Sequence, residues 1–123
     1  MSNRKNPPVF LTRAQVEALR AVPEPIRPEE SAALERLIAI AVTDSGQARR
    51  VADFLLAWWN AGSCGSFDLT NLWAVDAAIA RDMQTVIGLI ARVHQYPDKL
   101  GYGKSFDAIV RAWRPDLLGG ADD

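Results

Sequence analysis

One predicted helix, residues 44–61, is apolar around more than half of its circumference. At about 100° per residue, its apolar positions cover an arc of roughly 200°. These positions are Ala48, Val51, Phe54, Leu55, Leu56, Trp58, Trp59 and Gly62. Since one neighbouring element cannot cover so wide an arc, we expect this helix to be the central and most buried element, packed on two sides. Trp58 and Trp59 should lie in the core, with an edge of one indole exposed.

Helix-start signals recur along the rest of the chain, and no segment alternates as a strand does. The signals are a capping box, a proline at a first helical position before acidic residues, and capping side chains. In chain order they are Thr12 with Gln15, Pro28 with Glu29 and Glu30, Asp44 with Gln47, Asp68, and Ser105. They predict an all-α, single compact domain of about five helices and no sheet. The expected helices are residues 12–21, 28–42, 44–61, 68–95, and a fifth from Ser105 to Pro115.

Length and charge limit the organisation of the chain. Its 123 residues suit one domain, expected at residues 12–118, between a flexible basic N-terminal arm (1–11) and a disordered acidic tail (119–123). A net charge of −1 gives no field that would hold the whole protein to nucleic acid or an anionic membrane. The single cysteine excludes an internal disulfide, and no run approaches the ~20 apolar residues of a membrane span. We expect a cytoplasmic protein.

The predicted helix 68–95 contains one anomaly. Asp76 falls on the same face as its apolar residues, where a charged group is costly unless it is paired. Two explanations stay open. Either the helix breaks near Val75 and Asp76 caps a second segment, which we favour, or Asp76 is buried with a partner.

The stretch "LLAWWNAGSCGSFDLTNLW", residues 55–73, places tryptophans on both sides of a loop. Its backbone needs no catalytic explanation. Gly62 is expected to end one helix, Gly65 permits a positive φ, and Asp68 starts the next helix, while Ser63 and Ser66 bond the backbone. The sequence therefore predicts a connection between helices here.

Catalytic and metal-binding patterns are weak. Cys64 and His94 would stand about 39 Å apart along a straight helix, beyond the reach of a nucleophile and its base. "GKS" at residues 103–105 ends like a phosphate-binding loop, but Asp98 stands where that motif needs glycine. One cysteine and one histidine give no ligand cluster. We expect no enzyme, no metal and no cofactor.

Residues 51–115 nevertheless carry recognisable motifs: "VADFLLAWWNAG", "FDLTNLW", "VDAAIARDM" and "YPDKLGYGKSFDAIVRAWRP". In these motifs the chain resembles an uncharacterised family of small proteins encoded on proteobacterial plasmids and integrative conjugative elements. The resemblance implies an accessory protein of a mobile genetic element. It carries no assigned activity and no functional residues.

The leading functional hypothesis is a non-enzymatic binding module that contacts a protein of the element or of the host, with a host defence complex as one candidate. Its surface is expected at the rim of the loop: Trp59, Ser63, Ser66, Phe67 and Trp73. The alternative is a nucleic-acid-binding or regulatory protein that uses the basic arm together with Arg49 and Arg50, although no helix shows a dense basic face. An enzyme ranks third.

Overall fold

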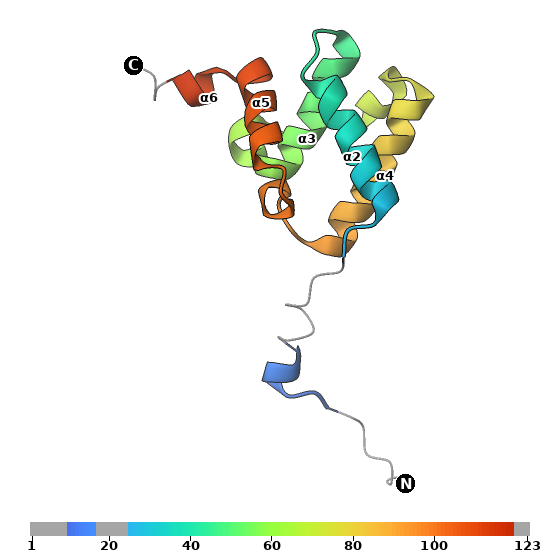
Figure 1. The fold of residues 1–123 in the computed structure, drawn as a ribbon, viewed down its shortest axis with the longest axis vertical. Coiled ribbons are helices and arrows are strands. Elements are labelled where there is room, and N and C mark those ends of the chain that lie inside the picture. The colour runs from blue at the N-terminus through green and yellow to red at the C-terminus, as the bar shows by residue number, and fades with distance from the viewer. Residues whose placement is uncertain (1–9, 17–24, 120–123) are drawn as a thin grey trace.

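The computed structural model describes residues 10–16 and 25–119, and no strand occurs in these ranges. The four long helices are α2 (Pro28–Ala41), α3 (Gly46–Cys64), α4 (Ala77–Val93) and α5 (Gly103–Trp113). Three short elements complete the domain: the 3-10 helices η1 (Leu69–Ala74) and η2 (Pro97–Leu100), and α6 (Asp116–Gly119). The prediction of a single all-α domain without a sheet is confirmed (Figure 1).

Two helices share the centre of this fold. As predicted, α3 is packed on two sides, by α2 and by α5, and it contributes the largest set of buried residues. These are Ala48, Val51, Ala52, Phe54, Leu55, Leu56 and Cys64. However, α2 is equally central, because it packs against α3, α4 and α5. The central position of α2 was not predicted.

Some helix boundaries differ from the predictions. Ser45, and not Asp44, caps α3, since its side chain accepts a hydrogen bond from the amide of Ala48 at 3.0 Å. The α5 helix begins at Gly103, so Ser105 lies inside it and does not cap it. Gly62 does not end α3 either. The helical backbone is interrupted at Asn60 (φ −163°, ψ 79°), and a last turn continues to Cys64 before Gly65 ends it with a φ of 103°.

The N-terminal capping box is present. The Thr12 amide donates to Gln15 Oε1 at 2.8 Å, and the Gln15 amide donates to Thr12 Oγ1 at 3.0 Å. Residues 13–16 form the helical turn that follows. The remainder of the predicted helix 12–21, most of the predicted arm 1–11 and most of the predicted tail 119–123 lie outside the described residues.

The predicted break in residues 68–95 is also present. Val75 is extended, and α4 starts only after it, with Asp76 as the N-cap. Asp76 is exposed, so the buried alternative is wrong. It does have a partner, because its amide donates to Gln47 Oε1 at 2.6 Å and its carboxylate accepts from Gln47 Nε2 at 3.3 Å. Gln47 of α3 thus holds the first turn of α4.

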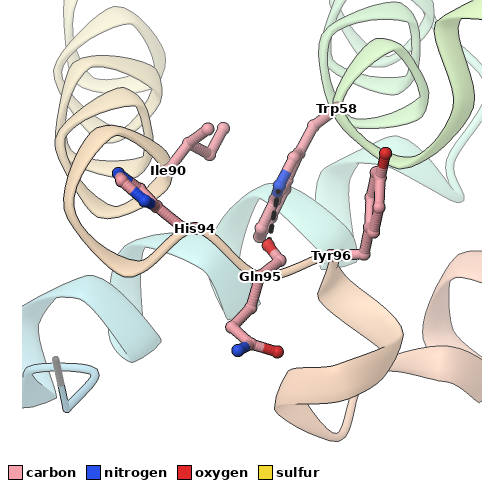
Figure 2. A pocket seen from close by; sticks show the side chains of 5 residues that line it. All are labelled: Trp58, Ile90, His94, Gln95 and Tyr96. Atoms are coloured by element: carbon pink, nitrogen blue, oxygen red, sulfur yellow. Dashed lines mark hydrogen bonds between the residues drawn. The ribbon is translucent and has the colours of Figure 1, made fainter. Parts of the chain in front are cut away.

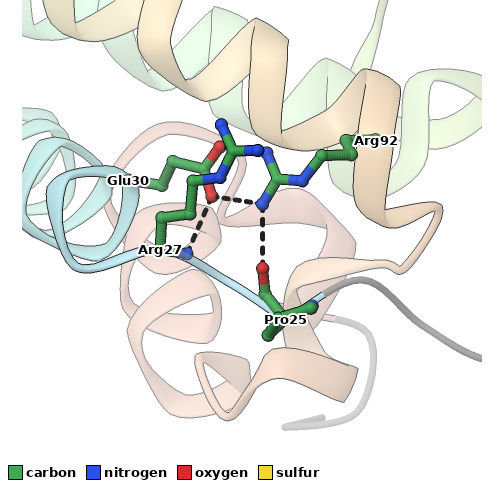
Figure 3. A network of polar contacts seen from close by, with 4 residues as sticks. All are labelled: Pro25, Arg27, Glu30 and Arg92. Carbon is green, nitrogen blue, oxygen red and sulfur yellow. Dashed lines mark hydrogen bonds and ion pairs between the residues drawn. The ribbon is translucent and has the colours of Figure 1, made fainter.

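An ion-pair network joins the start of α2 to the end of α4 (Figure 3). Glu30 is buried, accepts from both Nη1 and Nη2 of Arg92, the latter at 2.7 Å, and also accepts from the Arg27 amide at 2.9 Å. Arg92 Nη2 donates to the Pro25 carbonyl as well, at 2.8 Å. The hydrogen bond from Arg92 is the main cause that lowers the pKa of Glu30 to about 2, against the opposing effect of burial.

Candidate functional site

Residues 65–76, which we call the return segment, run back along α3 towards its N-terminus. Phe67 packs edge-on against Phe54 with ring centroids 5.3 Å apart. Further along, Arg50 Nε donates to Asn71 Oδ1 at 3.2 Å. The pairing of Asp76 with Gln47, nearly at the start of α3, completes the series. The return segment is therefore fixed to α3 at three successive points.

This path separates the two tryptophans that flank the loop. Trp59 lies at the C-terminal part of α3, where it is half-buried with its ring centroid 6.3 Å from that of Phe106. Trp73 lies on η1, beside the N-terminal part of α3. The helix rise between Gln47 and Trp59 is about 18 Å at 1.5 Å per residue. The predicted rim residues therefore belong to two regions.

The first region is the surface of η1, which we define by its two exposed apolar side chains, Leu69 and Trp73. Leu69 is 66% exposed and Trp73 is 85% exposed. The backbone beneath them is ordered, because the Asp68 side chain accepts from the Thr70 amide at 2.9 Å and caps η1. An indole held in water on a well-anchored turn is an unfavourable arrangement for an isolated protein and a common one at an interface.

The other predicted site residues lie around this region or between the two. Arg49 is exposed, whereas Arg50 is half-buried and engaged with Asn71. Ser63, in the last turn of α3, and Ser66, in the return segment, are exposed, and Phe67 is half-buried against Phe54. Leu69 was not predicted as a site residue, although the motif "FDLTNLW" contains it together with Trp73.

The second region is a hollow of about 280 Å³ at the far end of α3, which we call the aromatic hollow. Figure 2 shows Ile90 and His94, at the end of α4, on one side of the indole of Trp58 and Tyr96 on the other side, with the His94 ring turned back towards α4. The indole nitrogen of Trp58 donates to the Gln95 carbonyl at 3.2 Å and fixes the ring. No spacing rule brings residues 90–96 to Trp58, so this hollow could not be predicted from the sequence.

Trp58 and the fourth tryptophan, Trp113, stabilise the packing of these helices. Trp58 lies edge-on to Phe106 with centroids 5.9 Å apart, and it is half-buried. The Trp113 indole nitrogen donates to the Ala41 carbonyl, which joins α5 to the end of α2. Both side chains combine burial with a satisfied polar group, as tryptophans of a protein interior do.

The chemistry of Cys64 and His94 is that of structural residues. Cys64 is buried, and burial raises the pKa of its thiol despite the positive charge of Arg114 nearby. His94 ends α4 in the left-handed conformation, with Nε2 2.9 Å from the Ala91 carbonyl. Within residues 10–16 and 25–119, no three histidine, cysteine, aspartate or glutamate side chains gather as metal ligands would.

The "GKS" sequence opens α5, and Asp98 lies against it: a β-carbon placed on Gly103 would be 3.6 Å from Asp98 Cβ. A carboxylate at that position opposes the binding of a phosphate. No helix in the described part of the chain is long and apolar enough to cross a membrane.

Fold and surface together define a small all-α protein with a closed core and two separate aromatic regions on its exterior. The chain belongs to a family of unknown function, DUF7673, whose model matches residues 31–114. This agrees with the resemblance to an uncharacterised family noted from its motifs. No curated protein matches the chain, and no solved structure does.

Proposed function

We propose that the protein is a non-enzymatic binding module that docks on another protein through the surface of η1. The observation that carries the proposal is the 85% exposure of Trp73 on a turn whose backbone is anchored at Asp68, Asn71 and Asp76. A rigid anchor of this kind loses little conformational entropy on binding. Tryptophan is also among the residues that most often dominate the energy of an interface.

Neighbouring groups give this surface the composition of an interface. Leu69 adds a second exposed apolar side chain, and the exposed Asp68 and Asp76, with Arg50 bonded to Asn71, supply polar groups of both signs. Such a surface favours a protein partner over a polyanion, because it contains carboxylates as well as a guanidinium. The proposed mobile-element context, with a host defence complex as the target and the cytoplasm as the compartment, rests on the resemblance of the sequence motifs.

Nucleic-acid binding is the alternative proposal. Arg49 is free to contact a phosphate, but Arg50 already donates to Asn71 and to the Gly46 carbonyl. Duplex binding normally requires several phosphate contacts by lysine or arginine. The basic arm would have to supply nearly all of them.

Site-specific photo-crosslinking tests the leading proposal. A benzophenone amino acid is placed at position 69 on η1, which leaves Trp73 in place, in the full chain in a proteobacterial host, and a second variant carries it at exposed Leu117 on α6 as the matched control. We expect a discrete protein adduct from position 69 that position 117 does not give, and competition by the unmodified chain but not by Trp73→Ala. The absence of any protein adduct specific to position 69 would contradict the proposal.

A further inference from the structure

Two departures from helical backbone meet at the aromatic hollow. His94 is the one non-glycine residue with a positive φ, 58°, among those described. Asn60, within α3, has the extended dihedrals φ −163° and ψ 79°. The first lines the aromatic hollow, and the second lines an adjoining hollow that shares Trp58 and Tyr96 with it. These two irregularities therefore lie in the walls of the two hollows.

The walls of the aromatic hollow are suited to apolar side chains. The Trp58 nitrogen is already bonded to the Gln95 carbonyl, so what the indole presents to the hollow is its face (Figure 2). Ile90 adds an aliphatic wall, and Tyr96, 60% exposed, forms an aromatic edge. A volume of about 280 Å³ has room for one or two large side chains.

A segment of the same chain has matching chemistry. Residues 6–11 read "NPPVFL", and within them Phe10 is 82% exposed and Leu11 is also exposed. Two successive prolines restrict their own backbone and that of the residue before them, which lowers the entropy lost when such a segment docks in an extended form. The helical turn at residues 13–16 lies apart from the helices of its own domain (Figure 1).

The segment joins the helical domain at Pro25. The Pro25 carbonyl accepts from Arg92, near the end of α4, and α4 is the helix that supplies Ile90 and His94 to the hollow. Because residues 13–16 are helical, the fifteen steps of chain from Phe10 to Pro25 can span up to roughly 45 Å. Two molecules that meet with their hollows side by side therefore place each N-terminal segment within reach of the other hollow.

We propose that two copies of the chain associate by exchanging their N-terminal segments, with Phe10 and Leu11 of each copy entering the aromatic hollow of the other. A two-fold arrangement forms the same contact twice, so four apolar side chains leave water in a single association event. This interface uses the end of the molecule opposite to η1 along α3. The dimer is independent of the proposed function at Trp73.

Sedimentation of the full chain over a wide range of concentration tests the exchange. We expect a reversible monomer–dimer equilibrium whose dissociation constant rises about tenfold or more in Phe10→Ala and in Tyr96→Ala. Both residues are exposed in the single chain, so neither substitution should lower the melting temperature of the monomer. The matched control is Trp73→Ala, an equally exposed aromatic on η1, which should dimerise as the unmodified chain does.

A mixing experiment separates exchange from other modes of association. Phe10→Ala retains its hollow and Tyr96→Ala retains its segment, so an equimolar mixture should form heterodimers more readily than either variant forms homodimers. A chain that stays monomeric throughout the range would overturn the exchange. So would a dimer that resists both substitutions, or one that is lost in Trp73→Ala. Docking of the segment on its own hollow would appear as a concentration-independent change in Trp58 fluorescence on Phe10→Ala, and it would equally contradict the proposal.

Discussion

Arg92, near the end of α4, donates from Nη2 to Glu30 Oε1 at 2.7 Å, across 62 positions of sequence. The same carboxylate accepts from the Arg27 amide and so caps the first turn of α2. The buried Glu30 side chain thus caps its own helix and also joins α2 to α4. Loss of Glu30 removes the carboxylate that accepts from the Arg92 guanidinium and the acceptor of the Arg27 amide.

We expect Glu30→Gln to lower the free energy of unfolding by about 2 to 3 kcal/mol, because an amide replaces the ionised acceptor of a buried pair. Glu29→Gln is the matched control. Glu29 neighbours Glu30 in the first turn of α2 but is exposed, so its change should cost at most about 0.5 kcal/mol. Urea unfolding of the two variants at neutral pH measures the difference. Equal effects would contradict a special role for Glu30.

The same group predicts a pH dependence. Its pKa is lowered from 4.5 to about 2 in the folded chain, so folding favours the ionised form. The stabilisation is complete above the unfolded pKa and is lost as the pH falls from 4.5 towards 2. Unfolding curves across this acid range should show a steeper loss of stability in the unmodified chain than in Glu30→Gln. Parallel losses in the two proteins would show that other carboxylates dominate.

Trp58 and Trp73 should respond differently to truncation. Trp58→Ala removes a ring packed on Phe106 together with its hydrogen bond to Gln95, and should cost about 3 kcal/mol of stability. Trp73→Ala removes an exposed ring and should change stability by less than about 0.5 kcal/mol. Thermal unfolding of both variants provides the test. A large loss on Trp73→Ala would mean that Trp73 stabilises the fold and is not poised for a partner.

Cys64 should be unreactive in the folded protein. Burial both hides its thiol and raises the pKa of that thiol, so alkylation at mildly alkaline pH should be much slower than in the unfolded chain. Cys64→Ser should fold and retain function, with a loss of about 1 to 2 kcal/mol from placing a hydroxyl in an apolar site. Ser63→Ala, at the exposed residue next to Cys64, should leave the free energy of unfolding unchanged. Loss of function in a folded Cys64→Ser protein would instead require thiol chemistry.

Deletion of residues 1–8 should leave the melting temperature of the dilute protein unchanged. In the described part of the chain the cluster of buried residues begins at Ala33, and chain termini generally contribute little burial. The same deletion tests the alternative function. If the full chain bound duplex DNA tightly and with strong salt dependence, and the shortened chain did not, nucleic-acid binding would replace the protein-docking proposal.

Periodicity and capping predicted much of this fold because they act locally. The wide apolar arc of α3 required neighbours on two sides, and α2 and α5 occupy them. The break before Asp76 followed from the cost of a charge on an apolar face. The errors at Asp44, Gly62 and Ser105 are all at helix ends, where several nearby side chains compete for the same amides.

Long-range relationships were not predictable in the same way. The partners of Glu30, Gln47 and Trp58 come from distant parts of the chain, and their pairing depends on how the helices are placed in space. The exposure of Trp73 depends likewise on the course of the return segment. The sequence identified Trp73 as a candidate anchor, but only the structure separates it from Trp59 and reveals the aromatic hollow at Tyr96.

The return segment also bears on how the domain folds. Its contacts with α3 lie at growing sequence separation, from Phe54 with Phe67, to Arg50 with Asn71 at 21 residues, to Gln47 with Asp76 at 29 residues. Each contact shortens the loop that the next contact must close. The loss of chain entropy on loop closure is therefore divided among several small steps. The pair formed by α3 and the return segment can therefore form its contacts in order, starting at the Gly65 turn, before α2 packs against α4. The order in which amides of α3, η1 and α4 gain protection during refolding would record that sequence of events.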